Sequence, residues 1–248
     1  MSRVSRLAVL LLLFAVALAA SAPAHLLNRL VPRDTLYLQG FAGSLWRGSA
    51  SRCALRIGPS RYLQLGAVQW SLSPLSLLRL APRIRVHSSW GPQQLVGIAV
   101  LRDARSMDLE QVEARVSADL LRQLVPVALG GSLSLQLPSL RIRQSLPVAG
   151  EGRLVWQDAV WHSPRGPLPL GTYAVDLLSA PGQSLAGQVL TVSGPVQASG
   201  TVQLRDRAYT VDILVGAGQT LDPQLQQALS LLAAPQGDAY RLRLDGQL

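Results

Sequence analysis

The sequence predicts a mainly β protein in which an N-terminal transmembrane helix precedes a curved antiparallel β-sheet with two short helices. Three observations support this fold class. An apolar run opens the chain, short segments after it alternate between apolar and polar residues, and glycine or proline occupies nearly every gap between those segments. Such alternation is typical of antiparallel sheets that bury one face and expose the other.

The N-terminal segment has two interpretations. Residues 7–27 are mostly apolar and follow Arg3 and Arg6, which favours an uncleaved signal-anchor with a cytoplasmic N-terminus. A helix over these residues would span about 30 Å, enough to cross a bilayer. Residues 22–24, Ala-Pro-Ala, instead resemble the end of a cleavable signal peptide. We expect residues 1–30 to form a cytoplasmic tail and a single transmembrane signal-anchor.

The stretch around Trp70 organises the first part of the domain. Val68, Trp70 and Leu72 fall on one side of a two-residue period, which predicts a half-buried strand that ends before Pro74. Upstream, two glycines bracket Leu45-Trp46, as turns bracket a short edge segment. We expect Trp46 and Trp70 to be buried packing residues.

Further segments show the same alternation, preceded by a first strand near Leu36 and Leu38. They are residues 83–87, 132–137, 140–143, 201–205, 209–213 and 240–245.

Two stretches have helical spacing instead. Residues 116–125 place Val116, Leu120 and Leu124 on one face, with a proline next in the chain. Residues 223–233 begin with a proline after Asp222, a candidate N-cap.

These two helices also suggest an internal duplication. We expect residues 31–248 to form a β-rich domain outside the cytoplasm, composed of two pseudo-repeats at residues 43–126 and 150–235. Each opens on a Gly–Trp segment and closes on a helix. The reuse of Gly, Ser and Pro at the turns of β proteins is the alternative explanation.

The net charge is +9, and all 23 basic residues are arginines. They are scattered along strands without an aromatic platform, which argues against a nucleic-acid partner. The polar faces of three expected strands carry arginine pairs that would form one positive stripe if the strands were neighbours, or individually solvated charges if not. The pairs are Arg83 and Arg85, Arg141 and Arg143, and Arg241 and Arg243.

Catalytic patterns are absent. The chain has no lysine for a phosphate-binding loop, no His-Glu-x-x-His and no Gly-x-Ser-x-Gly. His25, His87 and His162 are too dispersed to predict a metal site, so we expect no metal and no cofactor. Cys53 is interpreted as a small core residue, and Asp158 as a turn-facing or arginine-paired carboxylate. The sequence therefore predicts that the protein is not an enzyme.

Three segments resemble type II secretion system protein N, a component of the general secretion pathway of Gram-negative bacteria. They are residues 43–50, residues 70–78 and residues 152–156, and their order and spacing agree with the family over nearly the whole chain. The chain departs from the family in Val155, interposed before a tryptophan, and in its arginine-only basicity. From these segments we select structural or partner-contacting candidates, which are Trp46, Gly48, Trp70, Pro74 and Trp156.

The resemblance implies a single-pass protein of the inner membrane with a cytoplasmic N-terminus and a periplasmic domain. It implies support of the export of folded proteins across the outer membrane, through contacts with the secretin or other components of the machine. It also implies likeness to the AsmA-like group, whose sheets form an open barrel or groove. The alternative function is accordingly the binding or transfer of lipid in an apolar groove.

Overall fold

The computed structural model describes residues 21–26, 36–56, 62–103, 105–123, 128–180, 184–218 and 221–247. The chain divides into two compact units, Met1–Trp90 and Gly91–Leu248. Most of the expected signal-anchor lies outside the described residues. None of the helices among the described residues is both long and apolar enough to span a membrane.

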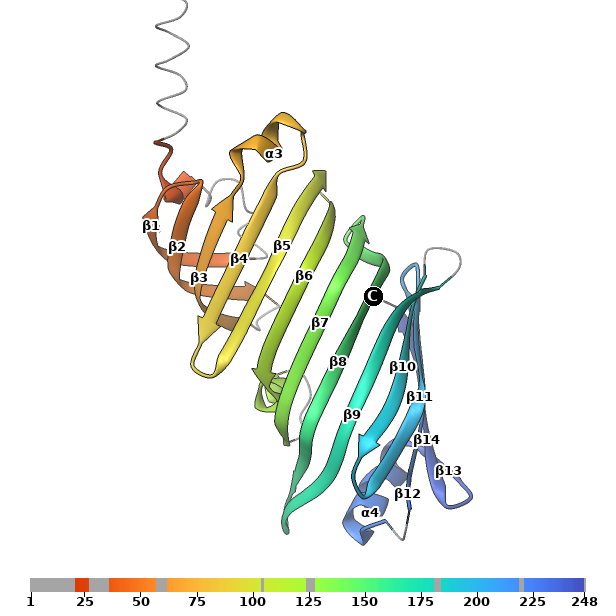
Figure 1. Ribbon diagram of the computed structural model, residues 1–248. Helices are drawn as coiled ribbons and strands as arrows, with labels where there is room; N and C mark the ends of the chain where they lie inside the picture. The colour runs from red at the N-terminus through yellow and green to blue at the C-terminus, as the bar shows by residue number, and fades with distance from the viewer. Residues whose placement is uncertain are drawn as a thin grey trace, which may run out of the picture. The chain divides into compact units, whose positions relative to one another are not determined.

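The first unit holds an antiparallel sheet whose strands follow the chain order (Figure 1). A short helix, α3 (Pro74–Leu78), connects its last two strands, and a 3-10 helix, η1 (Ala24–Leu26), precedes the first. The strands are β1 (Leu36–Gly43), β2 (Arg47–Arg56), β3 (Tyr62–Leu72) and β4 (Arg83–Trp90). The expected end of a strand before Pro74 is confirmed, because β3 stops at Leu72.

Trp70 lies at the centre of the core of this unit. Its side chain is only 8% exposed, and its indole Nε1 donates a hydrogen bond to the carbonyl oxygen of Leu45 at 3.1 Å. The ring of Phe41 meets it edge-on with 6.3 Å between centroids. The buried residues around it are Ala24, Leu38, Ala50, Cys53 and Val68. The predicted burial of Trp70 is confirmed, whereas Trp46 is only half-buried.

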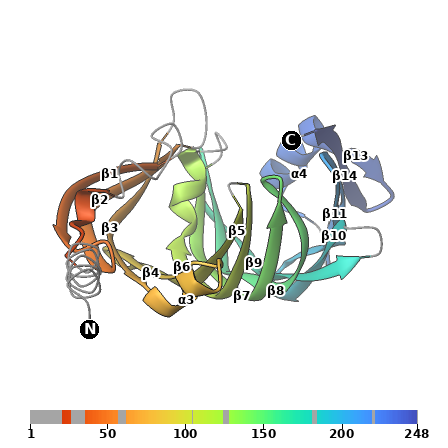
Figure 2. The same cartoon turned by 90° about the horizontal axis from the view of Figure 1, so that it is seen from above.

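The second unit is a longer antiparallel meander in the order β5-β6-β7-β8-β9-β10-β11-β12-β14-β13. Later strands turn out of the plane of the earlier ones (Figures 1 and 2). The long strands are β5 (Gln93–Asp103), β6 (Ser106–Ser117), β7 (Leu129–Arg143), β8 (Leu146–Ser163) and β9 (Gly166–Ala180). The others are β10 (Ser184–Ser193), β11 (Val196–Arg205), β12 (Ala208–Ala217), β13 (Ala234–Gln236) and β14 (Ala239–Gln247).

β-bulges accompany this curl. Gln111 in β6 and Asp158 in β8 have positive φ angles of 50°, and the pairing register shifts beside each of them. An extra residue on one strand bends it and increases its twist. Gly131 has a φ of 106°, and a Cβ there would approach the Gln157 carbonyl oxygen at 2.5 Å. Asp158 is therefore an exposed bulge residue of this sheet.

Both expected helices are present, although the first is shorter than expected and is a 3-10 helix. Helix α4 (Pro223–Leu232) begins as predicted, with the Asp222 carboxylate accepting a hydrogen bond from the Gln224 N–H at 2.8 Å. At residues 116–125, however, β6 continues to Ser117 and a 3-10 helix, η2 (Ala118–Gln123), follows. Val116 therefore belongs to the end of β6, and Leu120 to the 3-10 helix that follows it.

Replacing Trp70 with alanine should lower the free energy of unfolding by about 3–5 kcal/mol, because it leaves a cavity in the core. The free energy of unfolding of a typical domain is about 5–15 kcal/mol, so this substitution would remove much of the stability. Urea denaturation of the full chain measures this change. Tyr62→Ala is the matched control, because Tyr62 is 50% exposed and its truncation should change stability by at most about 0.5 kcal/mol. Equal losses in both variants would contradict the packing role.

Candidate functional site

One face of the second unit is apolar across nine strands. The register places Leu135 opposite Leu154 and Leu154 opposite Val175, and the same row continues in both directions. From β5 to β14 it reads Leu95, Ala114, Leu135, Leu154, Val175, Val189, Gly200, Ile213 and Leu242. Directly opposed residues of an antiparallel pair share a face. We call this surface the apolar face.

The residues of the row are mostly half-buried. Val189 is 8% exposed, whereas the others keep intermediate exposure. Where the chain is described, helix α4 lies beside β14 and η2 beside β7. Core positions in a two-layer domain would lose nearly all their exposure, so the apolar face has the accessibility of a contact surface rather than of a sealed core.

The adjacent row lies on the opposite face and is polar. It reads Val96, Glu113, Gln136, Arg153, Asp176, Gln188, Thr201, Asp212 and Arg243. Arg153 donates to both carboxylate oxygens of Asp176, at 2.5 and 2.7 Å. The hydrogen bonds and charge of Arg153 hold the pKa of Asp176 below its usual value. The two faces therefore differ in polarity along the same strands.

Trp156 stabilises the apolar face from within. Its Nε1 donates to the Gly130 carbonyl oxygen at 3.0 Å, and its ring lies 6.0 Å from that of Tyr173 between centroids. The Tyr173 hydroxyl lies 2.9 and 3.0 Å from the carbonyl oxygens of Leu170 and Val196. Burial raises the pKa of Tyr173 to about 12, so the phenol stays neutral. These contacts assign a packing role to Trp156; a partner-contacting role stays a prediction.

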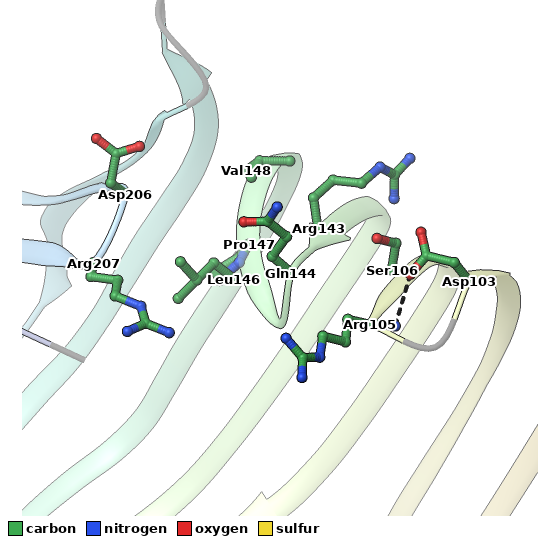
Figure 3. Close-up of a pocket in the computed structure, with 10 residues that line it drawn as sticks. All are labelled: Asp103, Arg105, Ser106, Arg143, Gln144, Leu146, Pro147, Val148, Asp206 and Arg207. Atoms are coloured by element: carbon green, nitrogen blue, oxygen red, sulfur yellow. Dashed lines mark hydrogen bonds between the residues drawn. The ribbon is translucent and has the colours of Figure 1, made fainter.

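A cavity of about 960 Å³ lies where three hairpin turns meet (Figure 3). Arg105 comes from the β5–β6 turn, Gln144 from the β7–β8 turn, and Asp206 with Arg207 from the β11–β12 turn. In a flat sheet β6 and β11 would lie about 24 Å apart. Their turns line one cavity because the sheet curls. The Ser145 N–H also donates to the Arg105 carbonyl oxygen at 2.9 Å, which ties two of the turns together.

Arginine dominates the polar lining of this cavity. Arg143 is held by Asp108, with 2.7 Å between Nη1 and Oδ1. By contrast, the guanidinium groups of Arg105 and Arg207 form no hydrogen bond or ion pair with other described residues. The backbone N–H of Arg105 donates a hydrogen bond to the carboxylate of Asp103. This hydrogen bond is the main reason why the pKa of Asp103 is below its usual value. Guanidinium groups bind carboxylate or phosphate oxygens, and the three arginines outnumber the two carboxylates of Asp103 and Asp206, so the lining has a net positive charge that suits an anion.

Four of the five sequence candidates lie in the first unit, and Trp70 is the buried residue described above. A Cβ at Gly48 would approach Cζ2 of Trp70 at 2.5 Å, so only glycine fits. The carbonyl oxygen of Trp46 accepts a hydrogen bond from the Leu72 N–H at 2.7 Å. Pro74 begins α3. None of these residues lines the arginine-lined cavity, whose residues the sequence analysis did not bring together because they come from distant turns.

Of the two alternatives for the arginine pairs, the single stripe is excluded for the pairs of the second unit, because their strands are not neighbours. Arg141 lies on β7 and Arg241 on β14, with five strands between them. Arg241 is instead paired with Asp212, with 2.8 and 2.5 Å between their nitrogen and oxygen atoms. Arg143 is likewise paired with Asp108, so the two arginine pairs do not form one surface.

The groups that catalysis or metal binding would need are dispersed. Burial raises the pKa of the Cys53 thiol to about 11, which disfavours the nucleophilic thiolate. Within the described ranges, no three His, Cys, Asp or Glu side chains converge as metal ligands would. His25, His87 and His162 lie on different elements and are exposed.

Replacing Asp108 with asparagine should destabilise the protein by about 1 kcal/mol at pH 7, because the carboxylate bridges Arg102 and Arg143. Burial opposes ionisation of Asp108, but the hydrogen bonds and charges of these arginines outweigh it and lower its pKa. A carboxyl whose pKa is lower in the folded chain than in the unfolded chain stabilises the fold at pH values above its unfolded pKa. This stabilisation is lost as the pH falls through its folded pKa. The deficit of the variant should therefore shrink as the pH falls below 3.8, the ordinary pKa of an aspartate, which urea denaturation at a series of pH values would measure. A deficit independent of pH would contradict this ion-pair role.

Comparison with known proteins agrees with the resemblance. The family model "Type II secretion system (T2SS), protein N" matches residues 34–243. Type II secretion system protein N of Aeromonas hydrophila is 29% identical over 226 residues, which cover 88% of this chain and 87% of that protein. Its namesake in Vibrio cholerae is 27% identical over 255 residues, with 96% and 97% covered. No solved structure matches. Since the family model covers most of its length, the chain belongs to the type II secretion system protein N family.

Proposed function

We propose that this protein is a non-enzymatic, single-pass component of the inner membrane that supports export of folded proteins across the outer membrane. Family membership makes it a component of the type II secretion machinery. The proposed action is contact between its periplasmic domain and other components of that machinery, the secretin among them. The observation that carries this proposal is the apolar face of the second unit, which remains partly exposed over nine strands.

An accessible apolar surface of this extent is costly in water. Contiguous apolar patches on soluble proteins rarely exceed a few hundred square ångströms, and larger ones mark interaction sites. On the opposite face, Asp176 and Asp212 of the polar row are already paired with Arg153 and Arg241. A partner that covers the apolar face therefore gains more from desolvation than one that covers the polar face.

Lipid is the second candidate ligand, and a specific pair of features favours it. The apolar face would accommodate acyl chains, and Arg105 and Arg207 offer two guanidinium groups to an anionic head group at the cavity (Figure 3). The two candidates differ in what touches the apolar face in cells, which a cross-linking experiment distinguishes.

A photo-cross-linking amino acid at Leu154, on the apolar face, should capture another secretion component in living cells. The same amino acid at Gln188, on the polar row, should not. Western blotting and mass spectrometry of the adducts measure the outcome. A lipid adduct at Leu154 would replace the protein-contact proposal with the lipid candidate. Protein adducts from Gln188 alone would contradict both. Thermal melting of each variant controls for folding.

The N-terminal segment is proposed to remain attached and to anchor the protein. Residues 7–27 are mostly apolar and follow two arginines, which supports a cytoplasmic N-terminus. N-terminal sequencing of protein extracted from membranes should give the initial residues of the chain. A mature chain that begins near His25 would show cleavage and contradict the anchor.

A further inference from the structure

The first unit carries the whole net positive charge of the chain. Residues 1–90 contain eleven arginines and a single acidic residue, Asp34, whereas residues 91–248 contain twelve arginines and thirteen acidic residues. Between residues 35 and 102 there is no carboxylate side chain at all. The strands of this unit therefore carry no carboxylate side chain, and the unit has a net positive charge that attracts anions.

Helix α3 presents leucines to solvent instead of burying them. Leu75 is 73% exposed, Leu77 37% and Leu80 87%. The helix projects beyond the ends of β3 and β4, which it connects (Figure 1). Three exposed leucines within six residues form a local apolar patch, which scattered surface leucines do not.

The projection is held in place by specific contacts. The Ser76 hydroxyl accepts a hydrogen bond from the Arg83 N–H at 2.8 Å, and the Ser76 carbonyl oxygen accepts one from the Ala81 N–H at 3.2 Å. Leu80 adopts a φ of 52°, the left-handed region. This conformation is common in the residue that follows a helix C-cap, and here the Leu80 N–H donates a hydrogen bond to the Leu77 carbonyl oxygen at 2.9 Å. Leu80 therefore belongs to the cap of α3, and its side chain is nevertheless left in solvent.

Arginines surround this patch. Arg79 follows the last turn of α3. Ser71 is one residue from the end of β3, where the connection through α3 begins. It lies opposite Arg85 of β4 on one side and opposite Arg47 of β2 on the other. All three arginines are exposed. We call Leu75, Leu77, Leu80 and these three arginines the α3 patch.

We propose that the α3 patch docks on the surface of an anionic phospholipid bilayer. The leucines enter the interface between head groups and acyl chains, and the guanidinium groups contact lipid phosphates. Apolar side chains beside arginines are the combination that binds anionic membranes, and each arginine near such a surface contributes about a fivefold gain in affinity. The contact would orient the first unit against a membrane. It does not depend on the secretion role, and it involves neither the apolar face nor the cavity.

An environment-sensitive fluorophore at Leu80 tests the proposal. The full chain, with Cys53→Ala and Leu80→Cys, is labelled with NBD and incorporated into nanodiscs. In discs of phosphatidylethanolamine and phosphatidylglycerol the emission should shift to the blue and strengthen, compared with discs of phosphatidylcholine. The matched control is Leu178→Cys, which is 58% exposed and lies on β9. Its emission should be the same in both lipids.

Charge variants separate this contact from any effect of the N-terminal segment, which all proteins in the experiment share. Arg79→Gln with Arg85→Gln should return the Leu80 signal to its phosphatidylcholine value. Arg115→Gln with Arg165→Gln, exposed in the second unit, should leave it unchanged. Unchanged Leu80 emission in anionic discs would overturn the proposal, as would an equal shift at Leu178. A shift that needs another secretion component would also overturn it, in favour of a protein partner. Equal melting temperatures confirm that the variants are folded.

Discussion

The structure of the second unit depends on one alignment, the register that sets apolar residues opposite one another from β5 to β14. Shifting any strand by one residue would move Leu154 or Val175 to the polar face and bring Arg153 or Asp176 to the apolar one. Cross-strand pairs on both faces thus specify the same register. The bulges at Gln111 and Asp158 bend the sheet without losing that alignment, because the pairing resumes beyond each of them.

Local periodicity predicted much of this fold. Alternation located the strands of Trp70, Leu135 and Ile213, and the cap at Asp222 located the start of α4. The helix expected at residues 116–125 is present as the 3-10 helix at Ala118–Gln123, but its start was placed two residues too early because the apolar residues at helical spacing include the end of β6. Long strands such as β8 were harder to delimit, since its bulge interrupts the alternation.

The candidate site was predicted less well, because it depends on contacts between turns far apart in sequence. Arg105 and Arg207 belong to different hairpins, and only the curl of the sheet brings them to one cavity. The arginine stripe failed for the same reason, since the sequence does not give the number of strands between Arg141 and Arg241. The burial of Trp70, by contrast, follows from its own strand and was predictable.

The strand at the edge of the sheet in the second unit, β13, has a consequence for assembly. β13 is only three residues long, and Pro235 at its centre has no N–H to donate. A free strand edge is a template for adding another strand, and a short edge that contains proline resists this addition. β13 therefore disfavours the addition of a strand from another chain at this edge. Fibres that would form by repeated strand addition there are disfavoured as well.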